Sequence, residues 1–221
     1  SIMVRRIYVE KKKPFAGRAK ELKEEIAGYL GIRSVDEVRI FIRYDVENVS
    51  DEVFEQATTT VFSEPPVDIL YREEIAVPSN ASVFSIEALP GQFDQRADSA
   101  EQCVRFIRED EQPVIRTAVT YMLIGDISES ELTKIEEYVM NPVDSRISAA
   151  EKPQTLVTDY EEPEDVKLFE GFVQMPEKEL QDLYESLGLA MTFHDFKWIQ
   201  TYFRDDEHRD PTMTEIRVLD T

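Results

Sequence analysis

The sequence has little cysteine, histidine or glycine, and each scarcity excludes a type of site. The single cysteine, Cys103, cannot form an internal disulfide or supply a zinc site built from several cysteines. The two histidines, His194 and His208, stand in no His-x-x-x-His spacing. With only seven glycines, the chain contains no glycine-rich phosphate loop. Residue types alone therefore identify no metal, disulfide or nucleotide motif.

Long apolar runs are also missing. No stretch approaches the roughly 20 residues that span a bilayer. The first residues, SIMVRRIYVEKKK, lack the apolar core of a signal peptide. We therefore expect a cytoplasmic location. Ser1 and Ile2 precede Met3, a pattern that fits a cloning remnant ahead of a native start at Met3.

Positive charge is scarce, because 25 Lys and Arg residues stand against 46 Asp and Glu residues, for a net charge of −21. The electrostatic field of so negative a chain repels nucleic-acid phosphates and anionic lipids, so we expect neither nucleic acid nor a membrane as a partner. The exception is residues 1–33, where nine Lys and Arg outnumber four Asp and Glu. Its run Lys11, Lys12 and Lys13 could hold a phosphate or an acidic surface, although such a run is more commonly a solvated loop.

The 221 residues, of which 42% are hydrophobic, suffice for one or two domains with a buried core. They contain an internal repeat: residues 4–77 and 81–152 each predict strand, helix, strand, helix, strand, displaced by 77 or 78 positions. Both second helices begin at a serine cap and are followed by Pro-Val-Asp. The first copy's apolar positions are Phe15, Ala19, Leu22, Ile26 and Tyr29 in the helix and Val38, Ile40, Ile42, Tyr44 and Val46 in the strand. The second copy's are Phe93, Ala97, Ala100, Val104 and Ile107, then Ile115, Thr117, Val119, Tyr121 and Leu123.

The apolar faces of the predicted helices and strands must be buried against one another. The repeat therefore predicts an α+β domain over residues 1–152. Its β-α-β-α-β halves are expected to share one pseudo-twofold sheet with helices packed on it, and each central strand should bury one face. From Thr158 to Asp165 the chain is acidic and contains Pro163, which is typical of a connector. We therefore predict an acidic connector and a small helical linker domain over residues 153–221.

Three short helices are expected in this second domain. Pro176 opens the first and Gly188 ends it. Thr192 with Asp195 resembles a capping box for the second, and Asp210-Pro211 opens the third. The inward apolar positions are Leu180, Leu183, Tyr184 and Leu187, then Phe196, Ile199 and Phe203, then Ile216 and Leu219. So short a segment is expected to lack a core of its own and to pack on something else.

Few residues are candidates for catalysis or metal binding, and a simpler structural role is available for each of them. Cys103 lies on the flank of a helical apolar stripe, which favours a packed thiol over a nucleophile. His194 falls in the first turn of a predicted helix, where a capping contact is the simpler role. His208 lies among acidic residues that could ligate a divalent cation or form a solvated loop. These acidic residues are Asp205, Asp206, Glu207 and Asp210.

Two carboxylates occupy equivalent positions in the repeats. We interpret Glu10 and Glu87 as symmetric surface groups, because acid–base catalysis would need paired carboxylates to lie close together. We therefore expect no catalytic, cofactor-binding or metal-binding residue in the chain.

Three motifs stand in a fixed order along the chain. A helix ends in Val139-Met140-Asn141-Pro142-Val143-Asp144, Leu187-Gly188-Leu189-Ala190 precedes another helix, and Arg209-Asp210-Pro211-Thr212 is followed by Glu215. The first motif, in its duplicated setting, resembles the S-subunit-like amino-terminal domain of the large, single-chain type of phosphoribosylformylglycinamidine synthase. The other two are similar to the helical linker of that family. The resemblance covers residues 4–221.

The resemblance implies that the chain is an amino-terminal scaffold fragment of a longer ligase, truncated before the synthetase domain. The parent enzyme would convert formylglycinamide ribonucleotide, glutamine and ATP to formylglycinamidine ribonucleotide, the fourth step of purine biosynthesis, with magnesium and ATP as cofactors. Its partners would be the synthetase and glutaminase domains of the same parent chain. The fragment alone is then expected to be inactive and to hold no cofactor.

Two alternatives remain. Duplicated α+β halves with a basic patch also fit a stand-alone regulatory module that binds a small anionic effector at the pseudo-twofold interface. A free-standing hydrolase would instead use a metal at His208 and its acidic neighbours. A specific metabolite that raises thermal stability would favour the regulatory module, whereas metal-dependent stability would favour the hydrolase.

Overall fold

A computed structural model describes residues 3–157 and 170–220. The chain divides into two compact units, residues 1–157 and 158–221, so the first unit ends five residues after the predicted boundary at 152. The predicted acidic connector, Thr158 to Asp165, lies outside the described residues, as do Ser1 and Ile2. Within the described ranges, every helix is too short or too polar to cross a bilayer.

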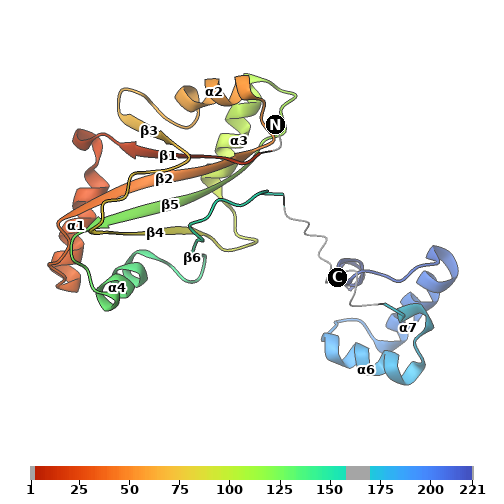
Figure 1. Ribbon diagram of the computed structural model, residues 1–221. Coiled ribbons are helices and arrows are strands. Elements are labelled where there is room, and N and C mark those ends of the chain that lie inside the picture. Colours follow the sequence, from red (N-terminus) through yellow and green to blue (C-terminus); the bar gives the residue numbers. More distant parts are fainter. Residues whose placement is uncertain (1–2, 158–169, 221) are drawn as a thin grey trace. The chain divides into compact units, whose positions relative to one another are not determined.

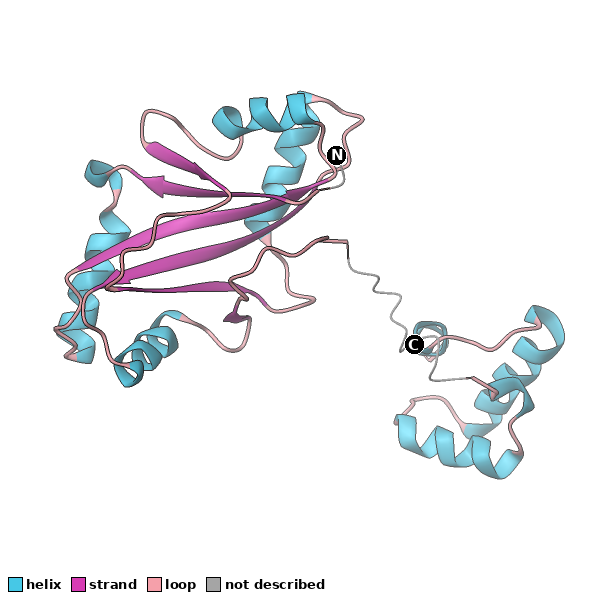
Figure 2. Ribbon diagram, viewed as in Figure 1, coloured by secondary structure: helices cyan, strands magenta, loops and turns pink. Residues whose placement is uncertain are grey.

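The first unit is a six-stranded sheet with strand order β3-β1-β2-β5-β4-β6, in which neighbouring strands are antiparallel (Figures 1 and 2). The first repeat contains β1 (Arg5–Lys11), α1 (Gly17–Leu30), β2 (Glu37–Glu47), α2 (Asp51–Thr60) and β3 (Asp68–Arg72). The second repeat contains β4 (Ala81–Ala88), α3 (Gln95–Ile107), β5 (Val114–Ile124), α4 (Glu129–Val139) and β6 (Ser145–Ile147). The predicted α+β fold with two β-α-β-α-β halves is confirmed.

The two repeats meet at the central strands of the sheet. Strands β2 and β5 pair along their whole length, and Ile42 lies opposite Val119 in the register. These two positions are also equivalent in the repeats, since they are 77 residues apart. A pseudo-twofold axis therefore passes through the Ile42–Val119 pair, and it relates α1 to α3 and α2 to α4.

The helices bury one face of the sheet in two clusters. Helices α2 and α3 cover a cluster around Tyr44 and Ile115, and α1 and α4 cover a cluster around Val38 and Leu123. The central positions of the predicted helical stripes are buried, as expected. They are Ala19, Leu22 and Ile26 in α1, and Ala97, Ala100 and Val104 in α3.

Three of the four stripe ends are exposed, contrary to the prediction, whereas Ile107 packs against the core. Phe15 is 53% exposed and Phe93 is 72% exposed. Both residues precede their helices, so the 3.6-residue period does not place them on the packed face. Tyr29 is 77% exposed in the last turn of α1, where its ring contacts Tyr138 of α4.

The opposite face of the sheet carries no helix, yet much of it is also buried. Phe41 and Met122 are fully buried there with Tyr8, and Ile75 packs against them from the segment after β3. The segment after β6 covers further residues of the same face. The prediction that each central strand buries only one face is therefore wrong, because the connections that follow β3 and β6 supply a second cover.

The second unit has a hydrophobic core of its own. Its helices are α6 (Glu177–Leu187), α7 (Phe193–Tyr202) and α8 (Met213–Leu219), with a π-helical turn over Phe203–Glu207 and a 3₁₀ turn over Phe172–Gln174. Six of its residues are at most 4% exposed, namely Phe172, Leu180, Phe196, Ile199, Phe203 and Ile216. The prediction that these helices lack a core is wrong, because three large aromatic rings fill the small interior.

The helices of the second unit begin and end close to the capping residues and the glycine that the sequence indicated. Gly188 ends α6 with a left-handed backbone (φ 60°), and Oγ1 of Thr192 accepts a hydrogen bond from the Asp195 amide. Helix α8 begins two residues later than Pro211, because Thr212 forms a reciprocal capping box with Glu215. Leu219 is 48% exposed rather than inward.

Candidate functional site

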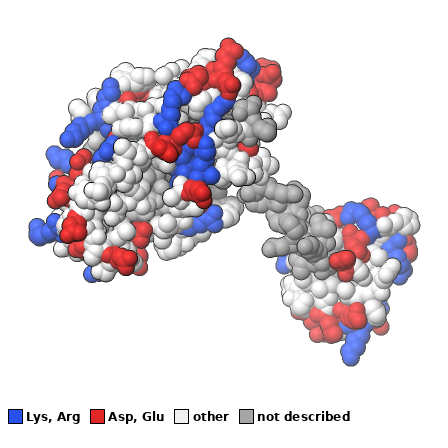
Figure 3. All heavy atoms as spheres, viewed as in Figure 1, with Lys and Arg blue, Asp and Glu red and all other residues white. Residues whose placement is uncertain are grey.

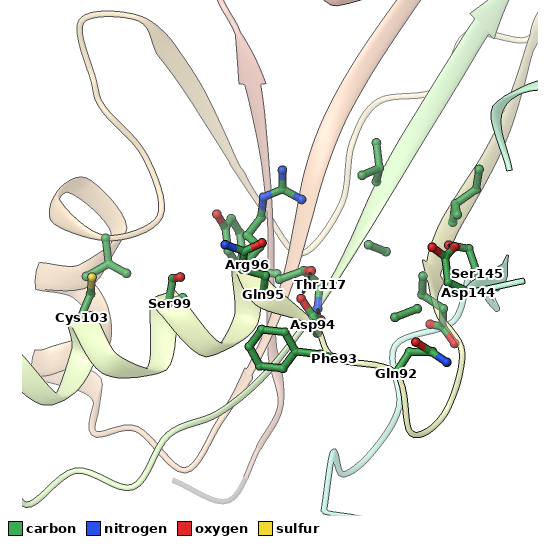
Figure 4. Close-up of a pocket in the computed structure, with 18 residues that line it drawn as sticks. Gln92, Phe93, Asp94, Gln95, Arg96, Ser99, Cys103, Thr117, Asp144 and Ser145 are labelled. Carbon is green, nitrogen blue, oxygen red and sulfur yellow. Dashed lines mark hydrogen bonds between the residues drawn. The ribbon is translucent and has the colours of Figure 1, made fainter. Parts of the chain in front are cut away.

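A groove of about 680 Å³ opens on the helix side of the sheet, between α3 and the edge formed by β4 and β6 (Figure 4). Its volume lies in the range of small-molecule sites. Tyr44, Ile86 and Val119 contribute apolar surface from the strands. Polar side chains surround this floor, and they include Arg96 and Ser99 of α3. The other polar lining residues used below are Gln92, Asp94, Thr117, Asp144 and Ser145.

The groove exists because the two repeats have diverged. Ala100 and Thr117 line it, and their equivalents in the first repeat are the larger Leu22 and Ile40. Leu22 is fully buried among the apolar residues under α1, where Ile40 packs beside it. The smaller side chains of the second repeat leave the corresponding volume open.

Asp94 connects the start of α3 to the floor of this groove. One carboxylate oxygen accepts hydrogen bonds from the Ala97 amide (3.0 Å) and the Thr117 hydroxyl (2.8 Å). The other accepts from the Thr117 amide at 2.9 Å. Asp94 is thus a helix cap that also fixes α3 against β5, and both of its oxygens are occupied.

Arg96 is the cationic side chain in the wall of the groove, where it extends from the first turn of α3 (Figure 4). Among the residues that the structure describes, it has no hydrogen-bond or ion-pair partner. Burial raises the pKa of Tyr44 and of Tyr121, and the charge of Arg96 opposes that rise in both. Arg96 therefore lies within electrostatic reach of two tyrosine hydroxyls that are equivalent in the repeats.

The helix-free face holds a network of buried charges. Arg39 donates two hydrogen bonds of 2.8 Å to Glu10, which raise the pKa of Arg39, and Tyr71 donates to the same carboxylate. Arg43 is 5% exposed, and both burial and the nearby charge of Arg6 lower its pKa. On the face shown in Figure 3, basic and acidic side chains lie interspersed, so this surface is not uniformly acidic.

Glu10 and Glu87 are not the symmetric surface groups that we predicted. Glu10 is 9% exposed, and the Glu87 side chain is 25% exposed. Tyr71 donates to Glu10 and Ser148 donates to Glu87, and these two donors are themselves equivalent in the repeats. Both carboxylates are part of the internal network, because the covering segments bring hydroxyl donors to them.

Residues 148–156 form a strap across this face. Nη2 of Arg43 donates to the Ser148 hydroxyl at 2.7 Å. The Leu156 amide donates to Oε1 of Glu47 at 2.6 Å, and the Leu156 side chain is buried. The charged side chains of β2 therefore bind a segment of the same chain.

The cysteine and histidines lie apart from one another. Cys103 is exposed and lines the groove, so the predicted packed thiol is wrong; its side of α3 faces the open volume rather than the core. His194 is exposed in the first turn of α7, where Thr192 provides the cap. His208 is exposed and ends the π-helical turn with a left-handed backbone (φ 56°).

Three of the four acidic residues around His208 already have partners. Asp210 accepts hydrogen bonds from the amides of Gly171 (2.9 Å) and Val173 (3.1 Å). Glu207 accepts from the Tyr202 hydroxyl, and Asp205 pairs with Arg204. Over residues 3–157 and 170–220, no group of three or more His, Cys, Asp and Glu side chains is placed to hold a metal ion.

The lysine run lies where β1 ends. Nζ of Lys11 lies 3.0 Å from Oδ1 of the buried Asp68, and the Lys12 amide donates to the Val67 carbonyl. Lys13 begins a 3₁₀ turn. Lys11 and Lys12 of this basic patch therefore bind groups of the first repeat itself.

No protein-family model matches the chain, and no curated protein sequence matches it significantly. The site is therefore defined by its own geometry. The sequence interpretation did not predict this groove. The sequence does contain a signal for it, because Ala100 and Thr117 are smaller than Leu22 and Ile40 at the equivalent positions of the first repeat.

Proposed function

We propose that this chain is a scaffold part of a glutamine-using, ATP-dependent ligase of the phosphoribosylformylglycinamidine synthase family. The observation that carries the proposal is the duplicated sheet, in which two β-α-β-α-β repeats pair through β2 and β5. A separate helical unit with the Leu187–Ala190 and Arg209–Glu215 motifs follows it in the chain. Duplication and motif order together support this family over an unrelated α+β protein.

The residues that carry the resemblance act as structural supports. Arg209 donates two hydrogen bonds to Glu215, at 2.8 and 2.6 Å, and Glu215 in turn accepts from the Thr212 amide. Asp220 accepts from the amides of Ala190 and Met191. These contacts hold helix ends together, which supports a scaffold role for the helical unit.

In this proposal the reaction takes place in other domains of the parent enzyme. The synthetase domain would use magnesium and ATP to phosphorylate the amide oxygen of formylglycinamide ribonucleotide. Ammonia released from glutamine by the glutaminase domain would then displace phosphate. The charged side chains of the first unit support this division of labour, because Arg6, Arg39 and Arg43 are bound to groups of the same unit.

The test compares three proteins. They are the product of the complete gene that contains this sequence, the same product without residues 1–221, and the 221-residue chain alone. We expect the complete product to form formylglycinamidine ribonucleotide from the three substrates and to bind magnesium-ATP in a calorimetric titration. The chain alone should show neither property, and the shortened product should lose activity.

Two results would overturn the proposal. One is a complete product that binds its substrates but forms no formylglycinamidine ribonucleotide. The other is tight, stoichiometric binding of magnesium-ATP by the 221-residue chain, because a nucleotide site would then lie within it.

A further inference from the structure

The groove beside the pseudo-twofold axis lies over positions at which the two repeats differ in side-chain size. The equivalent positions of the first repeat carry Leu22 and Ile40, which are packed under α1. The groove opens to solvent past the exposed Phe93 and Ser99, so a ligand can enter the volume that side chains fill in the first repeat. The retained hollow over Ala100 and Thr117 therefore points to an occupant that the first repeat does not have.

The cation in the groove differs from its equivalent in the first repeat. Arg18 lies 78 positions before Arg96, and Nη1 of Arg18 is 2.8 Å from Glu25. Arg96 has no such partner within the described ranges. A guanidinium group without a carboxylate partner, in a concave site, can bind an oxyanion with two parallel hydrogen bonds.

Three of the residues that line the groove carry a carboxylate, and two of these carboxylates are occupied. Asp94 accepts hydrogen bonds from Ala97 and Thr117 at both oxygens. The Glu87 carboxylate lies on the helix-free side of β4, where it accepts from Arg146 and Ser148. Asp144 is exposed and accepts from the Ser145 hydroxyl, and Figure 4 shows it across the groove from Arg96. The groove thus has a basic wall on α3 and an acidic wall at the start of β6.

The rest of the lining suits an organic body rather than a bare ion. Tyr44, Ile86 and Val119 provide an apolar floor, and the 72% exposed ring of Phe93 stands at the rim. Ser99 and Gln92 add hydroxyl and amide groups near the opening. An occupant with an apolar or planar body would cover this floor, while its charged group reaches Arg96.

We propose that this groove binds a small organic oxyanion, a carboxylate or phosphate on an apolar or planar body, with Arg96 as the charged anchor. The proposal concerns the second repeat alone and does not depend on the activity of a parent enzyme. The occupant would lie over Thr117 and Val119, against the Tyr44 ring.

The experiment is a ¹H–¹⁵N NMR titration of the 221-residue chain with phenyl phosphate, benzoate and inorganic phosphate, and with benzamide as the neutral ring. We expect shifts at Ser99, Thr117 and Val119 with phenyl phosphate, benzoate or both, and the stronger of these two identifies the oxyanion. Arg96→Gln should weaken that binding about tenfold, because it removes charge-assisted hydrogen bonds. Arg105→Gln, which removes an exposed charge elsewhere on α3, should leave it unchanged.

A second variant tests the groove without changing its charge. Ser99→Phe places a bulky ring at an exposed lining position and should abolish the shifts at Thr117 while the remaining spectrum stays folded. The proposal is overturned if benzamide binds as tightly as benzoate, or if Arg96→Gln binds like the unmodified chain. It is also overturned if none of the probes shifts the groove residues at concentrations on the order of 10 mM.

Discussion

Arg6 and Asp45 form a bidentate ion pair on the helix-free face of the sheet. Nε of Arg6 lies 2.7 Å from Oδ1 of Asp45, and Nη2 lies 2.8 Å from Oδ2. The two residues are direct partners in the β1–β2 register, and their side chains are 3% and 5% exposed. Nη1 of Arg6 donates to the Ala150 carbonyl at 2.7 Å. One buried pair therefore joins the first strand of the unit to the strap at its end.

Breaking this pair from one side should destabilise the first unit strongly. Asp45→Ala leaves the Arg6 charge buried without its partner, which costs about 3–5 kcal/mol in comparable cases. Urea unfolding followed by circular dichroism measures the loss, and Trp198 fluorescence reports the second unit separately. Asp126→Ala, at an exposed position, is the control and should change stability by less than about 0.5 kcal/mol. A loss below about 1 kcal/mol in Asp45→Ala would contradict the expectation.

Gly125 is required by a close backbone approach at the end of β5. Its φ is +146°, and an added Cβ would lie 2.0 Å from the Ser34 carbonyl oxygen. Backbone atoms cannot yield as a flexible side chain does, so Gly125→Ala should cost several kcal/mol of unfolding free energy, of the order seen for strained positions. Thermal unfolding of the first unit measures this effect.

Gly28 is the matched control for Gly125. It lies in the interior of α1, and an added Cβ would meet nothing within 4 Å. Gly28→Ala should therefore stabilise the unit by about 0.5–1 kcal/mol through helix propensity. Equal melting temperatures for the two alanine variants would refute the claim that the close approach of Ser34 requires glycine at position 125.

The core of the second unit depends on Phe196. This ring is fully buried, with ring centroids 5.4 Å from Phe172 and 5.6 Å from Tyr184. Phe196→Ala should cost about 3–5 kcal/mol, enough to unfold so small a unit. Trp198, the only tryptophan, is on α7 and reports this loss by fluorescence.

The first unit should be unaffected by Phe196→Ala, because each unit has its own core. Its circular dichroism transition is therefore expected at the same urea concentration in both proteins. Lys178→Ala, at an exposed position of α6, provides a control that should retain the fluorescence transition. Loss of both transitions in Phe196→Ala would mean that the units do not fold separately.

The stability of the second unit should fall in acid through Glu215. Hydrogen bonds from Arg209 hold the pKa of Glu215 at about 2, below its ordinary value of 4.5. The ionised carboxylate therefore stabilises the fold fully above pH 4.5, and this contribution is lost as the pH falls toward 2. The melting temperature from Trp198 fluorescence should decrease across this window.

Glu215→Gln isolates that contribution. The variant should melt lower than the unmodified chain at pH 7, because Arg209 loses its charged partner, and the two curves should converge toward pH 2. Asp220 also has a lowered pKa, through amide hydrogen bonds from Ala190 and Met191, so some acid sensitivity remains in the variant. Parallel curves for the two proteins would show that Glu215 does not titrate with folding.

Local signals predicted the helix ends well because they act over a few residues. Gly188 ends α6, Thr192 caps α7, and Ser128 forms a capping box with Glu131 at the start of α4. Prediction failed where distant segments meet. Cys103 lies between the buried Ala100 and Val104 along α3, but its side of the helix lines the open groove, so its thiol is exposed.

The sequence by itself determined the duplicated α+β fold, because the 77- to 78-residue offset sets the same order of strands and helices twice. The tertiary structure alone decided which faces are covered. Residues 148–156 bind Arg43 and Glu47 from more than 100 positions away. The open groove depends on the size of side chains from four strands and one helix. Burial is a sum over neighbours in space, and periodicity describes only neighbours along the chain.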